Sequence, residues 1–180
     1  MKFLLSLCLS VFAFNLFAQI EGTPFPDMET ETVEDKVINI PVDVQDKYTL
    51  LALAYSKKAE KDLTSWFSPV YNKFIKEATG VFASFSYDIN VFFVPMFTGV
   101  KAAATGTAKR KTAEELDPLL VPNILFYKGS LKPYKDALEF DKKDVPYLFL
   151  VDKDGKIAYA TSGEYTDEKM EAMEEFLDSL

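Results

Sequence analysis

The chain has 180 residues, of which 48% are hydrophobic and 14% aromatic, and it carries 20 basic against 28 acidic side chains. The resulting net charge of −8 argues against general affinity for nucleic acid or anionic lipid. Because the sequence contains no histidine, Ser-His-Asp and Cys-His catalytic groups and histidine-ligated metal sites are excluded. We predict no metal site and no cofactor.

The first 18 residues have the pattern of a secretory signal peptide. Lys2 precedes an apolar run from Phe3 to Phe17, and the small residue Ala18 follows it. The run is shorter than the roughly 20 residues that a membrane-spanning helix needs. We therefore expect cleavage near Ala18 and an exported protein, periplasmic or secreted, with no integral membrane segment after removal of the leader. The only cysteine, Cys8, lies in this leader, so the mature chain is expected to be cysteine-free.

The remainder, about 160 residues, is predicted to form one domain. Residues 19–35, with acidic side chains from Asp27 to Asp35, are predicted as an extended lead-in, and residues 36–180 as the domain itself. Val37 to Ile40 is predicted as a short strand that ends before Pro41.

The next two elements have strong apolar patterns. Tyr48 to Tyr55, YTLLALAY, is almost continuously apolar, which is typical of a strand buried on both faces. From Leu63 to Ala78, apolar residues recur every three or four positions and predict one helix. Pro69 lies inside that helix and predicts a kink at the preceding turn, and Gly80 is predicted to end it.

The middle of the chain is less clearly patterned. Ile89 to Val94 is predicted as a second buried strand, and Thr98 to Leu116 as a helix interrupted at Gly106. The basic run Lys109 to Lys111 is interpreted as a solvated helix face. Asn123 to Tyr127 fits either another strand or a buried turn.

The last third predicts a hairpin and a helix. Tyr147 to Val151 and Lys156 to Thr161 flank Asp152 to Gly155, in which an Asp-Gly pair suits a tight turn. A helix is predicted from an N-cap at Thr166, with an apolar face formed by Met170, Met173, Leu177 and Leu180. This order of elements predicts an α/β fold with a central mixed sheet flanked by helices on both faces.

The stretch DVPYLFLVDKDGKIAYATSG, residues 144–163, resembles the closing hairpin of the thioredoxin superfamily, and the preceding strand and kinked helix extend the likeness to a thioredoxin or peroxiredoxin-type domain. The resemblance implies a thioredoxin-like fold and a cis peptide bond at Val145-Pro146. It also implies redox cysteines between the central strand and the kinked helix. Here that junction is SKKAEKDLTSW, Ser56 to Trp66, and it contains no cysteine.

A second resemblance is closer within the superfamily. LALAYSKKAEKDLTSWFSPVYNKF, together with PYLFLVDKDGKIAYATSGEYTDEKMEAMEEFL, resembles the mitochondrial ATP synthase assembly factor family. That likeness implies a redoxin fold used to chaperone subunits during assembly.

Catalytic groups are hard to assemble from this composition. The hydroxyls of Ser56, Thr64 and Ser65 lie near the vacated redox site, but a hydroxyl nucleophile needs an activating base. Lys57 and Lys58 would serve only if buried, and a strand exit favours solvated lysines. We therefore assign no catalytic residue and expect neither thiol-disulfide oxidoreductase nor peroxidase activity.

The sequence favours a non-catalytic binding or assembly protein. Its predicted binding residues are those where the superfamily's substrate groove runs, and the predicted partner is a protein or extended peptide. These residues are Ser56, Lys57, Lys58, Val145 and Pro146. The alternative is an enzyme of unfamiliar mechanism that uses carboxylates and lysines on a redoxin scaffold.

Overall fold

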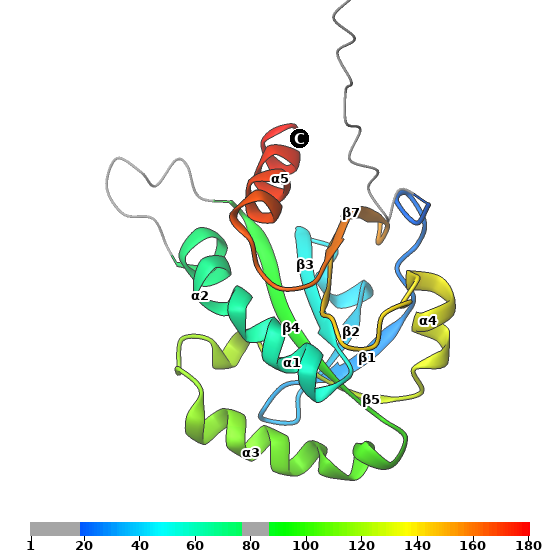
Figure 1. The fold of residues 1–180 in the computed structure, drawn as a ribbon, viewed down its shortest axis with the longest axis vertical. Helices are drawn as coiled ribbons and strands as arrows, with labels where there is room; N and C mark the ends of the chain where they lie inside the picture. The colour runs from blue at the N-terminus through cyan, green and yellow to red at the C-terminus, as the bar shows by residue number, and fades with distance from the viewer. Residues whose placement is uncertain (1–18, 77–86) are drawn as a thin grey trace, which may run out of the picture.

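A computed structural model describes residues 19–76 and 87–180 of the protein (Figure 1). The predicted signal peptide, residues 1–18, lies outside the described residues. So do Ala78 and Gly80, at which the first long helix was predicted to end.

The centre of the molecule is one seven-stranded mixed sheet with the strand order β2-β1-β5-β4-β3-β6-β7. Strand β3 pairs in parallel with β4 and antiparallel with β6, and β4 pairs in parallel with β5. The strands are β1 (Met28–Glu31), β2 (Val37–Ile40), β3 (Tyr48–Ala54), β4 (Ile89–Thr98), β5 (Phe126–Gly129), β6 (Tyr147–Val151) and β7 (Ile157–Ser162). The predicted mixed α/β sheet is confirmed.

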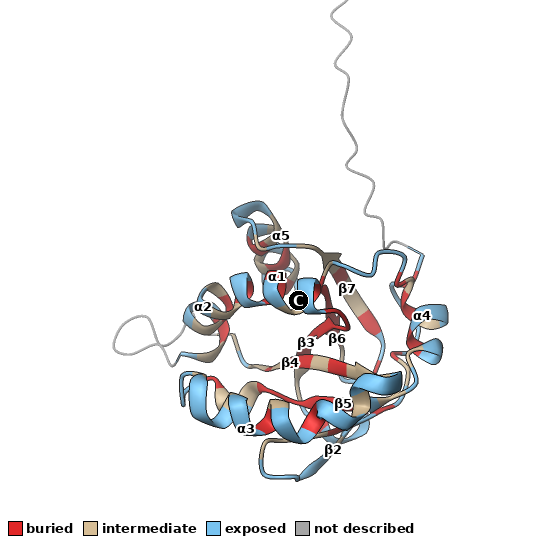
Figure 2. Cartoon of the chain, turned by 60° about the horizontal axis from the view of Figure 1, so that its bottom comes forward, coloured by how far each residue is buried: buried red, intermediate tan, exposed pale blue. Residues whose placement is uncertain are grey.

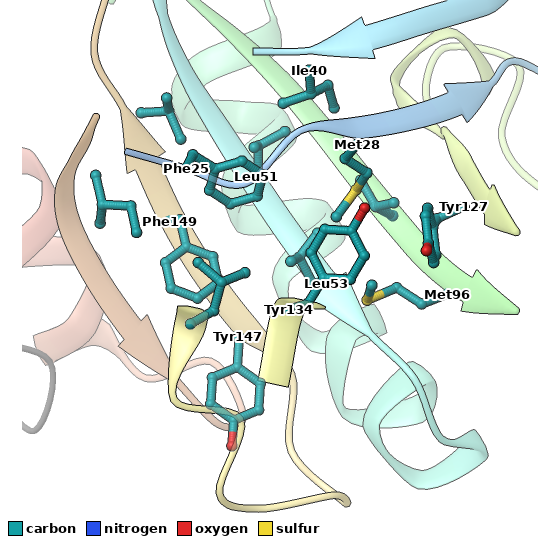
Figure 3. Packing of buried hydrophobic residues seen from close by; sticks show 14 of the residues in the cluster. Phe25, Met28, Ile40, Leu51, Leu53, Met96, Tyr127, Tyr134, Tyr147 and Phe149 are labelled. Carbon is teal, nitrogen blue, oxygen red and sulfur yellow. The ribbon is translucent and has the colours of Figure 1, made fainter. Parts of the chain in front are cut away.

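Strand β3 is buried on both faces, as its continuous apolar run predicts. Leu51 and Leu53 point into one core cluster, and Leu50, Ala52 and Ala54 into the other. The first cluster also holds Met96, Tyr134 and Phe149, which come from three different elements (Figure 3). Because successive side chains of a strand alternate between faces, this one strand contributes residues to the core on both sides of the sheet.

The helices are α1 (Lys57–Leu63), α2 (Phe67–Val70), α3 (Thr105–Glu115), α4 (Lys132–Leu138) and α5 (Asp167–Asp178). Helices α1, α2 and α5 contribute buried residues to the cluster on one face of the sheet, and Ala108 of α3 packs against its margin. Helix α4 contributes Tyr134 and Leu138 to the cluster on the other face. Helices therefore cover both faces, as predicted (Figure 1).

The first helical region begins earlier than predicted. Ser56 caps α1, so the residues from Lys57 onward, predicted as a junction, are already helical. A 3-10 turn at Thr64–Trp66 separates α1 from α2, and a π-helical turn, Tyr71–Ile75, follows α2. The departure from α geometry thus falls in the turn before Pro69, where the missing N–H of proline was predicted to act.

The middle of the chain also departs from prediction. Strand β4 continues through Pro95, which pairs with Ala54 at the last register position of β3, and its later residues pair with β5 instead. The sequence of Asn123 to Tyr127 fitted either a strand or a buried turn. The structure has a 3-10 turn at Val121–Asn123, and β5 begins three residues later at Phe126. Helix α4 was not predicted.

The segment 19–35, predicted as a lead-in, packs against the domain. Ile20, Phe25 and Met28 are buried in the core, and β1 pairs with both β2 and β5. Pro24 forms an isolated bridge with Lys156, so the chain before β1 also contacts the start of β7.

The C-terminal hairpin and helix follow the prediction closely. Strands β6 and β7 are antiparallel, and Gly155 in the turn has a φ of +77°. Thr166 caps α5 by accepting a hydrogen bond from the backbone N–H of Lys169. Met170, Met173 and Leu177 are buried, whereas Leu180, predicted on the same face, is 64% exposed because the helix ends at Asp178.

The interpretation of Lys109 to Lys111 as a solvated helix face is wrong for Lys109. Its side chain is only 9% exposed, and its Nζ contacts the carboxylates of Glu31 and Asp35. Most residues of α3 are exposed and are coloured pale blue in Figure 2; Thr105 and Lys109 are its buried residues, so this ion-pair cluster is the main buried polar attachment of α3 to the sheet. None of the helices described by the structure is long and apolar enough to cross a membrane.

Candidate functional site

The candidate site centres on Ser56, between the end of β3 and the first turn of α1. The Ser56 Oγ accepts a hydrogen bond from the backbone N–H of Ala59 at 3.1 Å, which is the usual role of an N-cap serine. The same hydroxyl donates to Asp144 Oδ1 at 2.9 Å. Ser56 is buried, so its side chain ties the start of α1 to the loop before β6.

The other predicted binding residues lie in the same region but differ in exposure. Lys57 and Lys58 are exposed on the first turn of α1. Val145 is partly buried and Pro146 is buried. The two lysines and the exposed Asp144 therefore form the accessible part of this region, and Pro146 lies beneath it.

The predicted cis bond at Val145-Pro146 is wrong. Among the described residues the cis peptide bond is Ile40-Pro41, so the bond before Pro146 is trans. The prediction came from resemblance alone, whereas trans is the preferred isomer of an X-Pro bond unless surrounding contacts select cis.

Two hydrogen bonds connect the loop before β6 to Gly163, which follows β7, and to Trp66. The backbone N–H of Gly163 donates to the Pro146 carbonyl at 2.8 Å, and Trp66 Nε1 donates to the Gly163 carbonyl at 2.9 Å. Trp66 is fully buried, and its ring meets that of Tyr165 edge to face at a centroid distance of 5.3 Å. The helical region after Ser56 is thereby connected to the start of β6 through the end of β7.

Two tyrosines hold the other side of the same loop. The Tyr55 hydroxyl donates to the Lys142 carbonyl at 3.0 Å, and the Tyr147 hydroxyl accepts from the Lys142 N–H at 2.7 Å. Burial, followed by the nearby Tyr147 and acidic side chains, raises the pKa of Tyr55 to about 12. Tyr55 therefore remains a neutral donor at physiological pH, and the backbone around Lys142 is fixed from two strands.

The hydroxyl groups of this region are engaged in local hydrogen bonds. The hydroxyls of Thr64 and Ser65 donate to the backbone carbonyls of Lys61 and Asp62, each at 2.6 Å. Ser56 is likewise committed to its cap and to Asp144. Over the described ranges, no group of three or more Asp, Glu, His or Cys side chains is placed to hold a metal ion.

Sequence reasoning missed Asp144 and the Trp66–Gly163 hydrogen bond. Ser56 and Asp144 are separated by 88 positions, and Trp66 and Gly163 by 97. The only available signal was indirect, because an N-cap serine after a buried strand marks a rigid helix start. The hydrogen bond from Ser56 to Asp144 joins two distant segments, so it could not be predicted from the sequence.

Comparison with known proteins identifies a family and a fold. The family model described as ATP10 protein matches residues 13–180. No curated protein matches the sequence.

Solved structures with the same fold are distant in sequence. BsSco, a member of the Sco family of cytochrome c oxidase assembly proteins, is 11% identical, with a TM-score of 0.56 over 86% of this chain and 94% of that one. A putative thiol:disulfide interchange protein DsbE from Chlorobium tepidum is 15% identical, with a TM-score of 0.52 over 88% and 96%. The reduced 2-Cys peroxiredoxin of Plasmodium vivax is 13% identical, with a TM-score of 0.50 over 89% and 98%. The fold is therefore thioredoxin-like, as predicted.

Proposed function

The chain belongs to the ATP10 protein family, and from this premise we propose that it is a thioredoxin-fold binding protein that assists the assembly of other polypeptides. Its partner is a protein or an extended peptide. The leader pattern of residues 1–18 supports export, to the periplasm or beyond the cell.

The observation that carries this proposal is the use of Ser56. The junction in which the fold resemblance implies redox cysteines, Ser56 to Trp66, begins with a buried serine that caps α1 and donates a hydrogen bond to Asp144. The site is thus built as a rigid surface, with Lys57 and Lys58 exposed on it. A structure of the same fold, BsSco, belongs to a family of assembly proteins, which is consistent with an assembly role on this scaffold.

The first prediction concerns redox chemistry. Disulfide exchange begins with attack by a thiolate, and the sole cysteine is Cys8 in the leader. The exported protein, expected to begin at Gln19, should neither reduce insulin disulfides nor consume peroxide above a buffer blank. Activity that persists after removal of contaminating oxidoreductases would contradict the proposal.

The second prediction tests the binding surface. Lys58→Glu reverses an exposed charge, so the free energy of unfolding should change by no more than about half a kcal/mol. A pull-down from the native host should nevertheless lose the partner recovered with the unchanged protein.

Lys61→Glu is the matched control, since Lys61 is exposed on the same helix at its other end. It should recover the partner in full. Equal recovery with Lys58→Glu, at an unchanged melting temperature, would show that this surface does not bind.

A further inference from the structure

The two edge strands of the sheet, β2 and β7, are covered to different extents. At β7 the N–H of Gly22 donates to the Ile157 carbonyl at 2.7 Å, and the N–H of Ile157 donates to the Thr23 carbonyl at 2.9 Å. Ala160, further along β7, is buried. Strand β2 has no strand beyond it in the described sheet, so its outward backbone groups are those with which another extended chain could pair.

The register of the β1–β2 hairpin identifies these outward groups. The N–H of Thr32 donates to the Lys36 carbonyl at 2.9 Å, which makes these two residues a hydrogen-bonded pair. Val37 is then opposite Glu31, and Asn39 follows two residues later on β2. Because hydrogen-bonded and non-hydrogen-bonded pairs alternate in an antiparallel ladder, Val37 and Asn39 turn their N–H and C=O groups away from β1.

Asp43 occupies one of the outward groups. Its Oδ2 accepts a hydrogen bond from the backbone N–H of Asn39 at 2.7 Å and another from Asn39 Nδ2 at 3.1 Å. Both residues are exposed, and β2 lies at the margin of the molecule (Figure 2). Over the described residues, the N–H and C=O groups of Val37 have no hydrogen-bond partner. A strand that approached β2 would therefore find the Asn39 N–H already taken.

The turn that carries Asp43 is held in place by its neighbours. Asp43 lies in the 3-10 turn Val42–Val44, and Val44 is buried. The Val44 carbonyl accepts hydrogen bonds from Thr49 Oγ1 at 3.2 Å and from Asn90 Nδ2 at 3.3 Å, which attach the turn to the first residues of β3 and β4. The Asp43 carboxylate is therefore positioned at the edge by a fixed turn, although it is itself exposed.

Apolar side chains flank the same edge. Val37 is 45% exposed and Val42 is 65% exposed. Valine favours strand pairing, and charged side chains at an edge oppose it. A second copy of β2 would match this edge by two-fold symmetry, with Val37 of each copy opposite Asn39 of the other. Each copy would then need the Asn39 N–H that Asp43 holds, and two carboxylates would approach each other.

We propose that Asp43 closes the β2 edge and thereby keeps two copies of this chain from joining their sheets through β2. The carboxylate removes one backbone donor from each of the two symmetric pairs, and like charges oppose the approach of the two edges. The inference does not rest on the proposed binding function. Strands β1, β5 and β4 separate β2 from β3 and from the candidate site.

Amide hydrogen exchange tests the contact in the unchanged protein. After correction for intrinsic rates, the Asn39 amide should exchange about tenfold or more slower than the Val37 amide, because the outward N–H of Asn39 is hydrogen-bonded. In Asp43→Ala at low protein concentration the difference should disappear. Equal exchange of the two amides in the unchanged protein would refute the proposal. This comparison needs no variant, so it remains decisive if Asp43→Ala does not fold.

Sedimentation equilibrium measures the consequence for association. Asp43→Ala should dimerise about tenfold or more tightly than the unchanged protein, since an Asn39 N–H becomes available on each copy. In the dimer the Val37 and Asn39 amides should both be protected from exchange. Glu29→Ala is the matched control, because Glu29 is exposed on the neighbouring strand β1 and its loss changes the net charge equally. This control should associate no more than the unchanged protein.

A second substitution locates the dimer. Val37→Lys, added to Asp43→Ala, places a cation on the edge of each copy and should restore the monomer. A dimer that survives Val37→Lys forms elsewhere and overturns the proposal, as does an Asp43→Ala variant that stays monomeric. Dimerisation of the unchanged protein with a protected Val37 amide would show that the edge is open. Protection of Val37 in monomeric Asp43→Ala by a peptide of alternating threonine and valine would assign the edge to any extended chain instead of a second copy.

Discussion

Replacement of Trp66 by alanine should lower the free energy of unfolding by about 3–5 kcal/mol, the usual cost of removing a large buried aromatic side chain. Trp66 is fully buried between the helical region and the end of β7, and its Nε1 donates to the Gly163 carbonyl at 2.9 Å. The alanine variant loses the packing and leaves that carbonyl without its donor. Chemical denaturation followed by circular dichroism measures the effect, since the chain has no other tryptophan to report by fluorescence.

Two further variants separate the contributions of Trp66. Trp66→Phe keeps an aromatic ring but removes the donor, so about 1–3 kcal/mol should be lost through the unpaired carbonyl and the smaller ring. Tyr165→Phe keeps the edge-to-face contact and removes only an exposed hydrogen bond to Asp167, so it should change stability by less than about half a kcal/mol.

The Trp66 variants also test the connection to the candidate site. Gly163 N–H holds the Pro146 carbonyl, so loss of Trp66 should increase hydrogen exchange of the Gly163 amide. A destabilisation below about 1 kcal/mol by Trp66→Ala would show that this buried ring is not the main support of the region.

Lys109→Glu should lower the free energy of unfolding by about 3 kcal/mol, the lower end of the cost of breaking a buried ion pair. The Lys109 ammonium lies between Glu31 and Asp35, with its Nζ 5.9 Å from the ring centroid of Phe126. A carboxylate there would face two like charges at a largely buried position. The cost stays at the lower end because the side chain of Glu31 is 44% exposed and that of Asp35 is 81% exposed.

A charge exchange distinguishes electrostatics from packing. Glu31→Lys combined with Lys109→Glu restores opposite charges and should recover at least half of the lost stability. Lys111→Glu, exposed on the same helix, should cost no more than about half a kcal/mol. Hydrogen exchange should show that α3 opens first in Lys109→Glu. Uniform exchange across the whole domain would contradict the view that this cluster is what attaches α3.

The same cluster has a defined pH dependence. Burial alone lowers the pKa of Lys109, but the hydrogen bonds and charges of Asp35 and Glu31 outweigh it, and the pKa is raised above 10.5. The folded state therefore holds this proton more tightly than the unfolded state. Its contribution to stability is fully present below pH 10.5 and is lost as pH rises through the higher folded value.

The elements that the sequence predicted well are those whose pattern is local. The apolar run at Tyr48 to Tyr55, the Asp-Gly turn before β7 and the cap at Thr166 each record their structure in adjacent residues. β1 could not be read in this way. METE is four residues long and acidic, and it is a strand because Thr30 and Glu31 pair with Tyr127 and Phe126, nearly 100 positions away.

Short helices escaped prediction for a related reason. Helix α4 has seven residues, so it shows fewer than two full repeats of helical periodicity, and it ends at Glu139 in the left-handed conformation. Of the candidate site, the sequence indicated Ser56 and the neighbouring lysines. It did not indicate Asp144, and it placed the buried Pro146 among the binding residues, because exposure depends on packing between distant segments.

The pairing of β1 with β5 also sets an order of events in time. A two-stranded hairpin is marginally stable alone, so β1 and β2 need the neighbour that β5 provides. A chain is synthesised from its N-terminus, and β5 begins only at Phe126. More than two thirds of the polypeptide must therefore be made before residues 28–40 have their place in the sheet. Until then the N-terminal segment stays accessible to any factor that recognises or processes it during synthesis.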